Sequence, residues 1–520
     1  MRSLTAGALL LAFGGCGFNA GAIGTAPQIR PGELVNDAAA PPEVASTHGI
    51  VTLELAAVIN STNGLPAFLY QGEYVAPTIR VNPGDTIQVD LDNELPPGHG
   101  AASDVNLHFH GLNVSPRRPA DDVITMFAKS GRTIFYSVPI PATQPPGLYW
   151  YHPHIHGQTD NQVGRGGMSG AIVVEGIQRH IPALAKMPER ILIVRELGNN
   201  GGEVRHHDGA PKGGMASMGL VESPDTAPGP SAGNVPCAPL ASGDYITVNS
   251  ELEPTIRFTP GKPQFFRILN ATGHRHIDLT LGDVPMHVVG VDGYPVDGFP
   301  GQPSSFTQTH IVVPPAGRIE FFATVTAATE LRSRCFDSGP IGDSDPPELL
   351  AHLRPYAGSQ HAAAVALEPP RAAAPLAVGT VSHAIPPPAA TRLVRFSEDA
   401  KGFYINGRAY SPNEAPVFVV KVGTVERWTV KNFTLEDHDF HLHQVHFHVE
   451  AVNGIADAQP LWRDTVVVPH GTRLAGGGFK PGSITLIADF RDPQIRGTFL
   501  FHCHILDHED GGMMAKIRAI

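Results

Sequence analysis

The stretch Pro77-Thr-Ile-Arg-Val-Asn-Pro-Gly84 decides the fold, because its pattern returns twice further along the chain. The second copy is Pro254-Thr-Ile-Arg-Phe-Thr-Pro-Gly261, and a more divergent third copy is Pro416-Val-Phe-Val-Val-Lys-Val-Gly423. An Asn follows nine residues after the Gly of each copy, at Asn93, Asn270 and Asn432. A strand, a turn and a second strand that recur at this spacing indicate an internal repeat.

The spacing of the copies predicts one domain for each. They begin 177 and then 162 residues apart, and 520 residues correspond to about three domains of ~150 residues. Gly (56) and Pro (49) punctuate short runs of Val, Ile, Thr and Phe, so we predict an all-β chain of β-sandwiches. We place these domains at residues 45–176, 180–355 and 390–520. An Ala- and Pro-rich linker is expected at 356–389, and a long Gly-, Pro- and Ser-rich surface loop at 199–242.

The first 22 residues have the layout of a secretory signal, with Arg2, an apolar run over 4–13 and small residues behind it. The run is too short to span a bilayer, so we expect no transmembrane span. Cys16 could carry a lipid anchor, as in bacterial lipoproteins; ordinary cleavage near residues 20–22 is the alternative. We therefore expect export to the periplasm or the extracellular space. There, Cys237 and Cys335 could form a disulfide.

The formal charge of the chain is −12, and we find no run of Lys and Arg. Nucleic acid is therefore not an expected partner.

Chemistry is concentrated in the stretch Phe501-His-Cys-His-Ile-Leu-Asp-His-Glu-Asp-Gly-Gly-Met-Met514. A Cys between two His, followed by a further His and a Met, supplies the soft and borderline ligands that copper prefers. If residues 497–505 form a strand, His502 and His504 share one face and Cys503 points to the other. One strand would then contribute ligands to two metal sites.

Domain one carries matching motifs without the thiol. Aligned through Gly147 and Gly497, its late motif has Pro153 where domain three has Cys503. Domain one also has Val105 at the position of His438. Only domain three can therefore assemble a site from Cys503, His438 and His508, with Met513 as a weak axial ligand.

Four His-x-His pairs remain, two from domain one and two from domain three. They are His108/His110, His152/His154, His441/His443 and His502/His504. Facing each other, these eight imidazoles could hold three metal ions between the two domains. Domain two has no matching set, which indicates a metal-free spacer. His156 lies on the face of His152 and His154 but has no counterpart in domain three, so we leave it outside the ligand set.

Together these motifs resemble three-domain multicopper oxidases of the laccase-like kind, which are built from cupredoxin Greek-key β-sandwiches. The resemblance runs from about residue 45 to the end of the chain. It implies four copper ions, the type 1 ion being bound by His438, Cys503 and His508 with Met513 axial. It assigns the type 2 ion to His108 and His441, and the type 3 pair to His110, His152, His154, His443, His502 and His504.

The resemblance also implies the reaction. A small donor, expected to be a phenol or an aromatic amine, would lose one electron at a time to the type 1 copper. The electrons would pass through Cys503 into His502 and His504, and dioxygen would be reduced to water at the other three ions. Oxygen reduction consumes protons, and Asp121, Asp122 and Glu509 stand where the family places acids.

One residue departs from the family pattern: Asp439 follows His438 where the family commonly has Pro. With Glu436 and Asp437 it could form an acidic rim that favours cationic donors.

Two other functions remain open on the sequence. A metallo-oxidase acting on cuprous, ferrous or manganous ions would use the same ligands. Copper-handling members of the family often carry a Met-rich insertion, whereas only Met215 and Met218 of the nine Met residues lie in the domain-two loop here, which argues against cuprous ions. A non-catalytic envelope protein of the same fold would be expected to have lost its ligands, whereas all of them are present here. Copper storage would not require the Cys503 connection between two sites.

Overall fold

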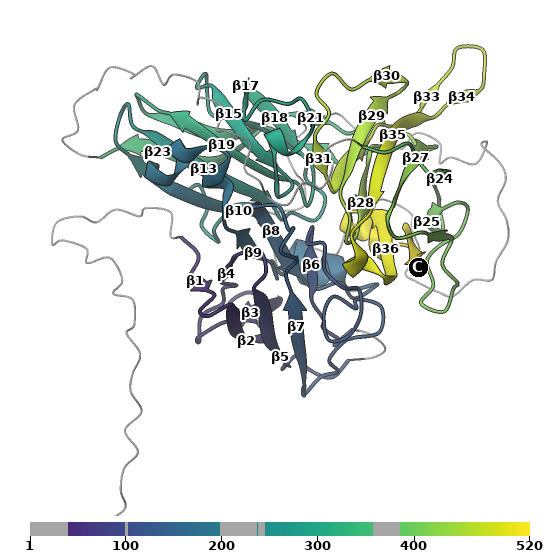
Figure 1. Cartoon of the computed structure of the whole chain (residues 1–520), viewed down its shortest axis with the longest axis horizontal. Helices are drawn as coiled ribbons and strands as arrows, with labels where there is room; N and C mark the ends of the chain where they lie inside the picture. Colours follow the sequence, from purple (N-terminus) through teal and green to yellow (C-terminus); the bar gives the residue numbers. More distant parts are fainter. Residues whose placement is uncertain (1–39, 99–101, 198–236, 238–244, 357–384) are drawn as a thin grey trace, which may run out of the picture. The chain divides into compact units, whose positions relative to one another are not determined.

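The computed structural model describes residues 40–98, 102–197, 237, 245–356 and 385–520 (Figure 1). In this part of the chain, six larger sheets contain almost all of the regular structure. The sheets form three pairs, here called sandwiches one, two and three in chain order. The prediction of an all-β chain of β-sandwiches is confirmed. The predicted signal at 1–22 with Cys16, and most of the loop at 199–242 and the linker at 356–389, lie outside the described residues.

Sandwich one has one sheet in the order β1-β4-β9-β8-β6 and one in the order β3-β2-β5-β7. Its strands are β1 (Glu43–Ala45), β2 (Ile50–Ile59), β3 (Pro66–Leu69), β4 (Thr78–Val81), β5 (Thr86–Asn93), β6 (His108–His110), β7 (Arg132–Pro139), β8 (Gly147–His152) and β9 (Gly170–Val174). The π-helix η1 (Asp160–Arg165) precedes β9, and the 3-10 helices η2 (Ile177–Arg179) and η3 (Pro182–Lys186) follow it.

Sandwich two pairs the sheet β11-β10-β13-β19-β15-β16, with β17 beside β15, with the sheet β12-β23-β20-β14-β18. The strands are β10 (Glu189–Leu197), β11 (Tyr245–Val248), β12 (Thr255–Phe258), β13 (Pro263–Asn270), β14 (Ile277–Thr280), β15 (Met286–Val291), β16 (Tyr294–Pro295), β17 (Phe306–Gln308), β18 (His310–Val313), β19 (Arg318–Thr324), β20 (Thr329–Arg334) and β23 (Glu348–Pro355). The hairpin β21 (Phe336–Asp337) and β22 (Ser344–Asp345) and the 3-10 helix η4 (Val296–Gly298) complete it.

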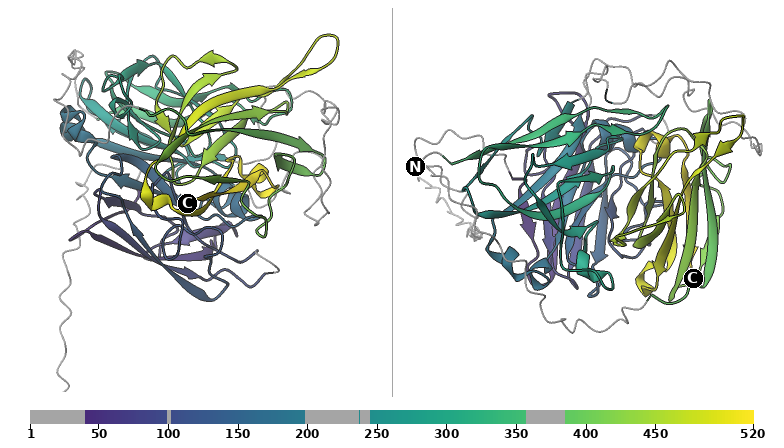
Figure 2. Two further views of the ribbon diagram at one scale, coloured as in Figure 1. Left: turned by 45° about the vertical axis from the view of Figure 1, so that its right-hand side comes forward. Right: turned by 90° about the horizontal axis from the view of Figure 1, so that it is seen from above.

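Sandwich three pairs the sheet β25-β24-β27-β35-β29-β30, with β31 beside β29, with the sheet β26-β37-β36-β28-β32. Figure 2 shows its green and yellow strands from two further sides. The strands are β24 (Ala390–Asp399), β25 (Gly402–Ile405), β26 (Phe418–Val420), β27 (Thr424–Asn432), β28 (His438–Leu442), β29 (Phe447–Val452), β30 (Ile455–Ala456), β31 (Trp462–Arg463), β32 (Thr465–Val468), β35 (Gly482–Phe490), β36 (Gly497–Cys503) and β37 (Met514–Ala519). The hairpin β33 (Thr472–Arg473) and β34 (Phe479–Lys480), the 3-10 helix η5 (Pro493–Ile495) and the helix α1 (Leu506–Asp510) complete it.

The three sandwiches share one strand topology around the sequence repeat. The strand before each repeat turn runs parallel to the last strand of its sandwich, as β4 with β9, β12 with β23 and β26 with β37. The strand after the turn runs parallel to an early strand, as β5 with β2, β13 with β10 and β27 with β24. The copies of the repeat therefore occupy equivalent places.

The Asn that follows each repeat turn at the same spacing has a structural role. In sandwich three, Nδ2 of Asn432 donates to the carbonyl oxygens of Glu436 and Val468, at 2.7 and 3.2 Å, and its Oδ1 accepts from the Thr434 amide. Asn93 and Asn270 each likewise donate to two carbonyl oxygens and accept from the amide two residues on. We call this arrangement the Asn latch; it fixes the loop that leads to the next strand of the opposite sheet.

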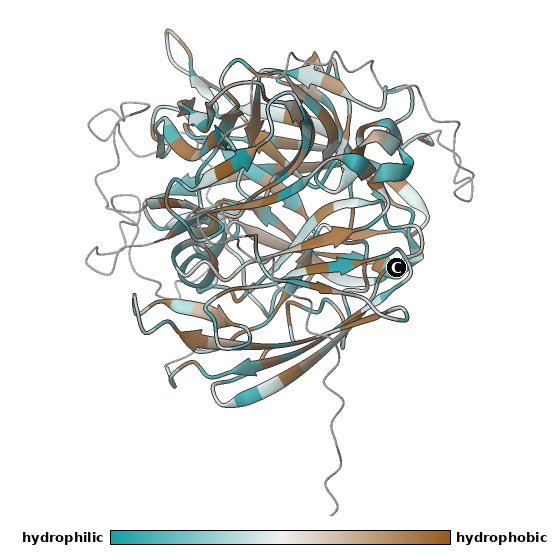
Figure 3. Ribbon diagram, turned by 90° about the vertical axis from the view of Figure 1, so that its left-hand side faces the viewer, coloured by the Kyte–Doolittle hydropathy of each residue, from teal (hydrophilic) through white to brown (hydrophobic). Residues whose placement is uncertain are grey.

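Burial explains which strands could be recognised from their pattern. Side chains of β2 and β5 alternate between buried and more exposed positions, as expected for strands with one face in the core. Figure 3 shows hydrophilic and hydrophobic residues following one another along many of the strands. All of β8 is buried instead. Its Leu148 and Trp150 pack in an apolar cluster with Ile193 and Leu269 of sandwich two and Leu506 of α1. Strand β8 is therefore covered on both faces.

Cys237 and Cys335 form a disulfide, with Cα atoms 5.3 Å apart, as the sequence allowed. None of the helices in the described residues is long and apolar enough to cross a membrane.

Candidate metal centres

Two strand pairs position the histidine ligands. In sandwich one β6 pairs with β8, so that His108 lies opposite His152, and in sandwich three β28 pairs with β36, so that His441 lies opposite His502. The two pairs hold equivalent places in their sandwiches and face each other. The His108 ring stacks on the ring of His443 with centroids 3.8 Å apart. Sequence reasoning predicted these motifs to align, and the topology brings them together.

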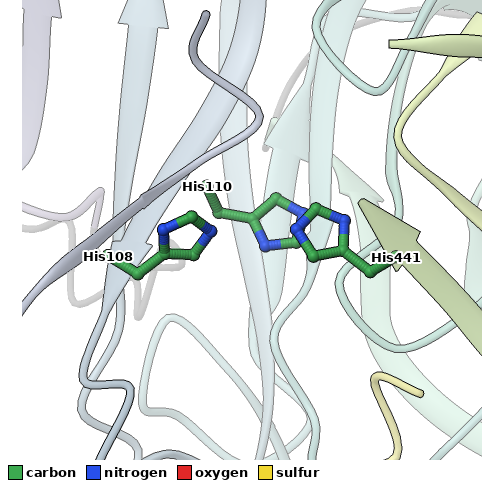
Figure 4. A group of neighbouring side chains, drawn as sticks. All are labelled: His108, His110 and His441. Carbon is green, nitrogen blue, oxygen red and sulfur yellow. The ribbon is translucent and has the colours of Figure 1, made fainter. Parts of the chain in front are cut away.

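The eight histidines form one buried cluster, which we call the histidine cage. Within it, three groups have ligand atoms that all lie within 4.8 Å of one another. These groups are His108 with His110 and His441 (Figure 4), His110 with His152 and His504, and His154 with His443 and His502. The cage is built equally from sandwiches one and three.

Unpartnered nitrogens show that the cage suits metal ions. Buried ring nitrogens without a hydrogen-bond partner occur on six of the eight rings: His108 Nε2, His110 Nδ1, His152 Nε2, His441 Nε2, His443 Nδ1 and both nitrogens of His504. On the remaining two rings, Nε2 of His154 and Nε2 of His502 lie only 3.3 Å apart. Buried polar atoms in proteins normally have partners, so bound metal ions would account for these atoms, and imidazole is a ligand that suits copper.

Hydrogen bonds at the other ring nitrogen orient the ligands. His152 Nδ1 lies 2.8 Å from the carbonyl oxygen of Pro153, and His502 Nδ1 lies 2.8 Å from that of Cys503. His441 Nδ1 lies 2.8 Å from the carbonyl oxygen of Asp464. Donation at Nδ1 leaves Nε2 with its lone pair toward the centre of the cage, which is the usual support for a metal-bound imidazole.

The cage histidines are neutral. Burial lowers the pKa of His152 to about 3 and that of His502 to about 4. Burial and the neighbouring imidazoles lower the pKa of His108 well below its ordinary value. A neutral imidazole is the form that binds a metal, so these side chains need not lose a proton near neutral pH.

A separate group, the cysteine site, consists of His438, Cys503 and His508. Cys503 Sγ lies 3.7 Å from His438 Nδ1 and 3.8 Å from His508 Nδ1, and the two Nδ1 atoms are 3.1 Å apart. Two unprotonated nitrogens and a thiolate at such distances fit one copper ion. Met513 is fully buried and its amide donates to the His508 carbonyl oxygen.

The cysteine site is fixed by its own loops. The Asn latch of sandwich three holds Thr434, whose Oγ1 lies 3.0 Å from His438 Nε2. His508 lies in helix α1 and stacks on Phe403 at 4.1 Å. Strand β36 ends at Cys503 rather than at residue 505, yet His502 and His504 both belong to the cage and Cys503 to the other site.

Of the three acids expected near the cage, two lie there. Asp121 Oδ2 lies 2.9 Å from His108 Nδ1, and burial raises the pKa of Asp121 to about 7. Glu509 Oε2 lies 3.2 Å from His502 Nδ1, and burial raises the pKa of Glu509 well above its usual value. Asp122 instead accepts from the amides of Ile124 and Thr125 in the loop. Of these three expected acids, Asp121 and Glu509 contact histidines of the cage and Asp122 does not.

The expected acidic rim is not a surface feature. Glu436, Asp437 and Asp439 are all buried, with 2%, 6% and 0% exposure, so that hypothesis was wrong for a rim facing solvent. The peptide of Asp439 instead lies against the thiol, with its amide donating to Cys503 Sγ.

His156 packs against Tyr410 with ring centroids 4.9 Å apart and is in none of the four ligand groups described above.

Sandwich two is more than a spacer. Its Arg318 is fully buried and donates to both carboxylate oxygens of Asp464, at 2.8 and 2.5 Å. Asp464 Oδ1 in turn lies 3.2 Å from His110 Nε2. Burial alone would raise the pKa of Asp464, but the Arg318 guanidinium lowers it, so the carboxylate is charged. Neither residue has a distinctive sequence signature, and sequence reasoning missed both.

Comparison with known proteins agrees with this geometry. Models of multicopper oxidase domains match residues 56–179, 208–331 and 384–519, which together span most of the chain. The chain belongs to the multicopper oxidase family. The family is one of copper oxidoreductases built from cupredoxin domains, which agrees with the two candidate metal centres described above.

Individual multicopper oxidase relatives are distant. Multicopper oxidase mco of Staphylococcus aureus is 21% identical over 467 residues, which cover 86% of this chain and 83% of that protein. Cell division protein FtsP of Escherichia coli is 24% identical over 460 residues, covering 86% and 84%. A solved multicopper oxidase from Campylobacter jejuni, described as a metallo-oxidase, has a TM-score of 0.68 at 21% identity and covers 92% of this chain and 94% of that one.

Proposed function

We propose that this multicopper oxidase takes single electrons from a small donor at the cysteine site and reduces dioxygen to water at the histidine cage. The observation that carries the proposal is the sequence His502-Cys503-His504, in which the thiol belongs to one site and both neighbours belong to the other. Bound copper would supply the one-electron steps and the reduction of dioxygen.

We assign four copper ions to the described residues. His438, Cys503 and His508, with Met513 as a further ligand, would hold the type 1 ion. The type 2 ion takes His108 and His441. The type 3 pair takes His110, His152 and His504 on one side and His154, His443 and His502 on the other, which follows the two remaining groups of the cage.

Acids on this chain can hold the protons that oxygen reduction consumes. The Thr159 hydroxyl lies 3.1 Å from Glu509 Oε1, and Glu509 borders His154 and His502. Asp510, the next residue, accepts from the amide of Asp160 at 2.9 Å, and burial raises the pKa of Asp510 to about 7. Asp121, beside His108, and Glu509, beside His154 and His502, would deliver protons from their carboxyl groups.

Phenols and aromatic amines are the first candidate donors. Glu436 Oε1 lies 3.5 Å from His508 Nε2, on the side of the imidazole opposite the thiol. Burial and the neighbouring carboxyl of Glu398 raise the pKa of Glu436 well above its usual value. The Glu436 carboxyl group would accept the proton that a phenol loses with its electron.

Ferrous, manganous or cuprous ions are the second candidate. The same carboxyl groups beside His508 offer hard oxygen ligands, which suit Fe²⁺ and Mn²⁺ better than Cu⁺. The Campylobacter jejuni relative is a metallo-oxidase by description. A third possibility is a non-catalytic role in the cell envelope, but that role would not need the complete ligand set; one relative is named cell division protein FtsP. The signal-like segment at 1–22 supports export in all three cases.

The test is purification with copper, followed by metal analysis, absorption spectroscopy and oxygen uptake. Four copper ions per chain and a blue band that disappears on reduction are expected. Oxygen uptake should be measured with a neutral phenol, a cationic aromatic amine and Fe²⁺. Glu436→Gln should slow the preferred donor, whereas Glu450→Gln, which changes an acid paired with Arg427 away from both sites, should not. Absence of oxygen uptake with every donor would favour the envelope role.

A further inference from the structure

A buried histidine of sandwich two contacts the residue that follows His438. His276 is 2% exposed and lies just before β14. It follows Asn270 by six residues, as His438 follows Asn432, so it occupies in sandwich two the place that the type 1 ligand occupies in sandwich three. The Asn latch of sandwich two fixes this loop through the carbonyl oxygen of Arg275.

His276 joins two carboxylates. Its Nδ1 lies 3.2 Å from Oδ2 of Asp345, and its Nε2 lies 3.2 Å from Oδ1 of Asp439. Both carboxylates are buried, and the ring stacks on Phe336 at 4.4 Å. Both ring nitrogens can donate at once only in the charged imidazolium. The contact therefore places one positive charge between two negative charges at the boundary of sandwiches two and three.

Asp439 touches both copper centres through its backbone. Its amide donates to Cys503 Sγ at 3.4 Å, and its carbonyl oxygen accepts from the His504 amide at 2.7 Å. The family-typical Pro has no amide hydrogen and could not make the bond to sulfur. Among the described residues, His276 is the only side chain hydrogen-bonded to the Asp439 carboxylate. The position of this peptide thus depends on a residue of another sandwich.

The geometry points to His276 as a positioning residue that fixes Asp439 beside the Cys503 thiolate and so sets the reduction potential of the type 1 site. This inference rests on the proposed assignment of a type 1 copper to Cys503. Hydrogen bonds to the Cys sulfur and nearby charges are the means by which a protein tunes such a site. The Asp439 carboxylate favours the oxidised, more positive ion, and the His276 imidazolium offsets this effect.

Two conservative variants should shift the potential in opposite directions. Asp439→Asn keeps the amide hydrogen and the side-chain shape but removes a negative charge, so the type 1 potential should rise. His276→Gln removes the positive charge and leaves Asp439 without its partner, so the potential should fall. The double variant His276→Gln/Asp439→Asn should return toward the parent value, because neither charge remains.

The experiment is a redox titration of the copper-loaded proteins, followed at the absorption band of the type 1 site. His310→Gln is the matched control, because His310 pairs with Asp278 in the same sandwich with its side chain 47% exposed; it should leave the potential unchanged. The copper-free proteins supply a second readout. In denaturant unfolding, the loss of stability in the double variant should be smaller than the sum of the two single losses.

Shifts of the same sign in both single variants, or no shift in either, would overturn the inference. If one single variant does not fold, the double variant and the remaining single variant still decide it. A parent protein that binds copper without a type 1 band would instead refute the proposed function, so the two failures can be told apart.

Discussion

Asp464 receives two hydrogen bonds from the guanidinium of Arg318, at 2.8 and 2.5 Å, in a fully buried ion pair. Arg318 belongs to sandwich two and Asp464 to sandwich three, and the same carboxylate lies 3.2 Å from His110 of sandwich one. One charge pair thus connects all three sandwiches at the edge of the histidine cage.

Removing the Arg318 guanidinium should lower the stability of the fold. Arg318→Met leaves the Asp464 carboxylate buried without compensation, and we expect the free energy of unfolding of the copper-free protein to fall by about 3–5 kcal/mol. Arg332→Met is the control, because the Arg332 side chain is 45% exposed and pairs with Glu330; its cost should be about 0–1 kcal/mol. Denaturant unfolding measures both, and equal small losses would show that the buried pair does not stabilise the fold.

The approach of Gly111 to this pair gives an independent prediction. A Cβ at Gly111 would lie 2.6 Å from both Arg318 Nη2 and Asp464 Oδ2, and the backbone has φ +85°. Gly131 has a similar φ of +71° with nothing within 4 Å of its Cβ position. Gly131→Ala should cost about 1–2 kcal/mol from backbone strain alone, and Gly111→Ala should cost more. Equal losses of stability would mean that the ion pair moves aside freely.

Replacing the thiol should separate the two copper centres. Cys503→Ser removes the soft ligand but none of the eight cage histidines. We expect loss of the blue band and of donor oxidation, with about three of four copper ions retained. Metal analysis and absorption spectroscopy measure this outcome. A variant that binds no copper would show that the ligands do not divide as proposed.

The two neighbouring aspartates should differ in function. Asp121 contacts His108, whereas Asp122 contacts loop amides. Asp121→Asn removes an acid beside the cage, and the rate of oxygen uptake should fall by a factor of about 10² or more. Asp122→Asn keeps Asp121 in place and should change the rate little. If both variants were equally slow with equal copper content, the effect would come from the loop rather than from a proton donor.

The pKa values of the cage predict how the copper-free protein responds to acid. His152 has a pKa of about 3 and His502 of about 4 in the folded state, against about 6.5 in an unfolded chain. Below about pH 6.5 the unfolded chain therefore takes up protons that the folded chain does not. Stability is lost as the pH falls from about 6.5 toward 4, and copper occupancy should fall in the same range.

Buried acids act in the opposite direction. Burial raises the pKa of Asp160 and Asp510 to about 7 each, so these groups stabilise the fold as the pH falls from about 7 toward 4. The cage histidines and the buried acids therefore oppose each other, and the double variant His152→Gln/His502→Gln isolates the histidine contribution. Between pH 8 and 5 the melting temperature of this variant should fall less, or rise more, than that of the parent. The same dependence on pH in parent and variant would contradict the low pKa values of these two histidines.

Much of this organisation could be predicted from local patterns. The repeat gave the three sandwiches because Asn93, Asn270 and Asn432 stand at a fixed distance from a turn. Because side chains alternate on a strand, His502 and His504 could be predicted on one face and Cys503 on the other, which indicated two separate sites. Such features depend on neighbours in the sequence, which a single chain shows directly.

Contacts between sandwiches could not be read in this way. Arg318 and Asp464 are 146 residues apart, and each looks like an ordinary polar residue near a strand end. Asp439 and its neighbours were expected at the surface, because charged residues usually are. Their burial depends on His276 and on the packing of sandwich two against sandwich three, which no local pattern encodes.

The Asn latch is the same in all three sandwiches, whereas the loop that it holds carries different functional residues in each. The same three hydrogen bonds hold a loop with a copper ligand in sandwich three, a loop with a charged histidine in sandwich two and a longer loop in sandwich one. A mutation can therefore give a loop a new task without rebuilding the strands beneath it. On our proposal, the loop of sandwich three carries the type 1 ligand His438, and the equivalent loop of sandwich two carries His276, which adjusts that site from outside.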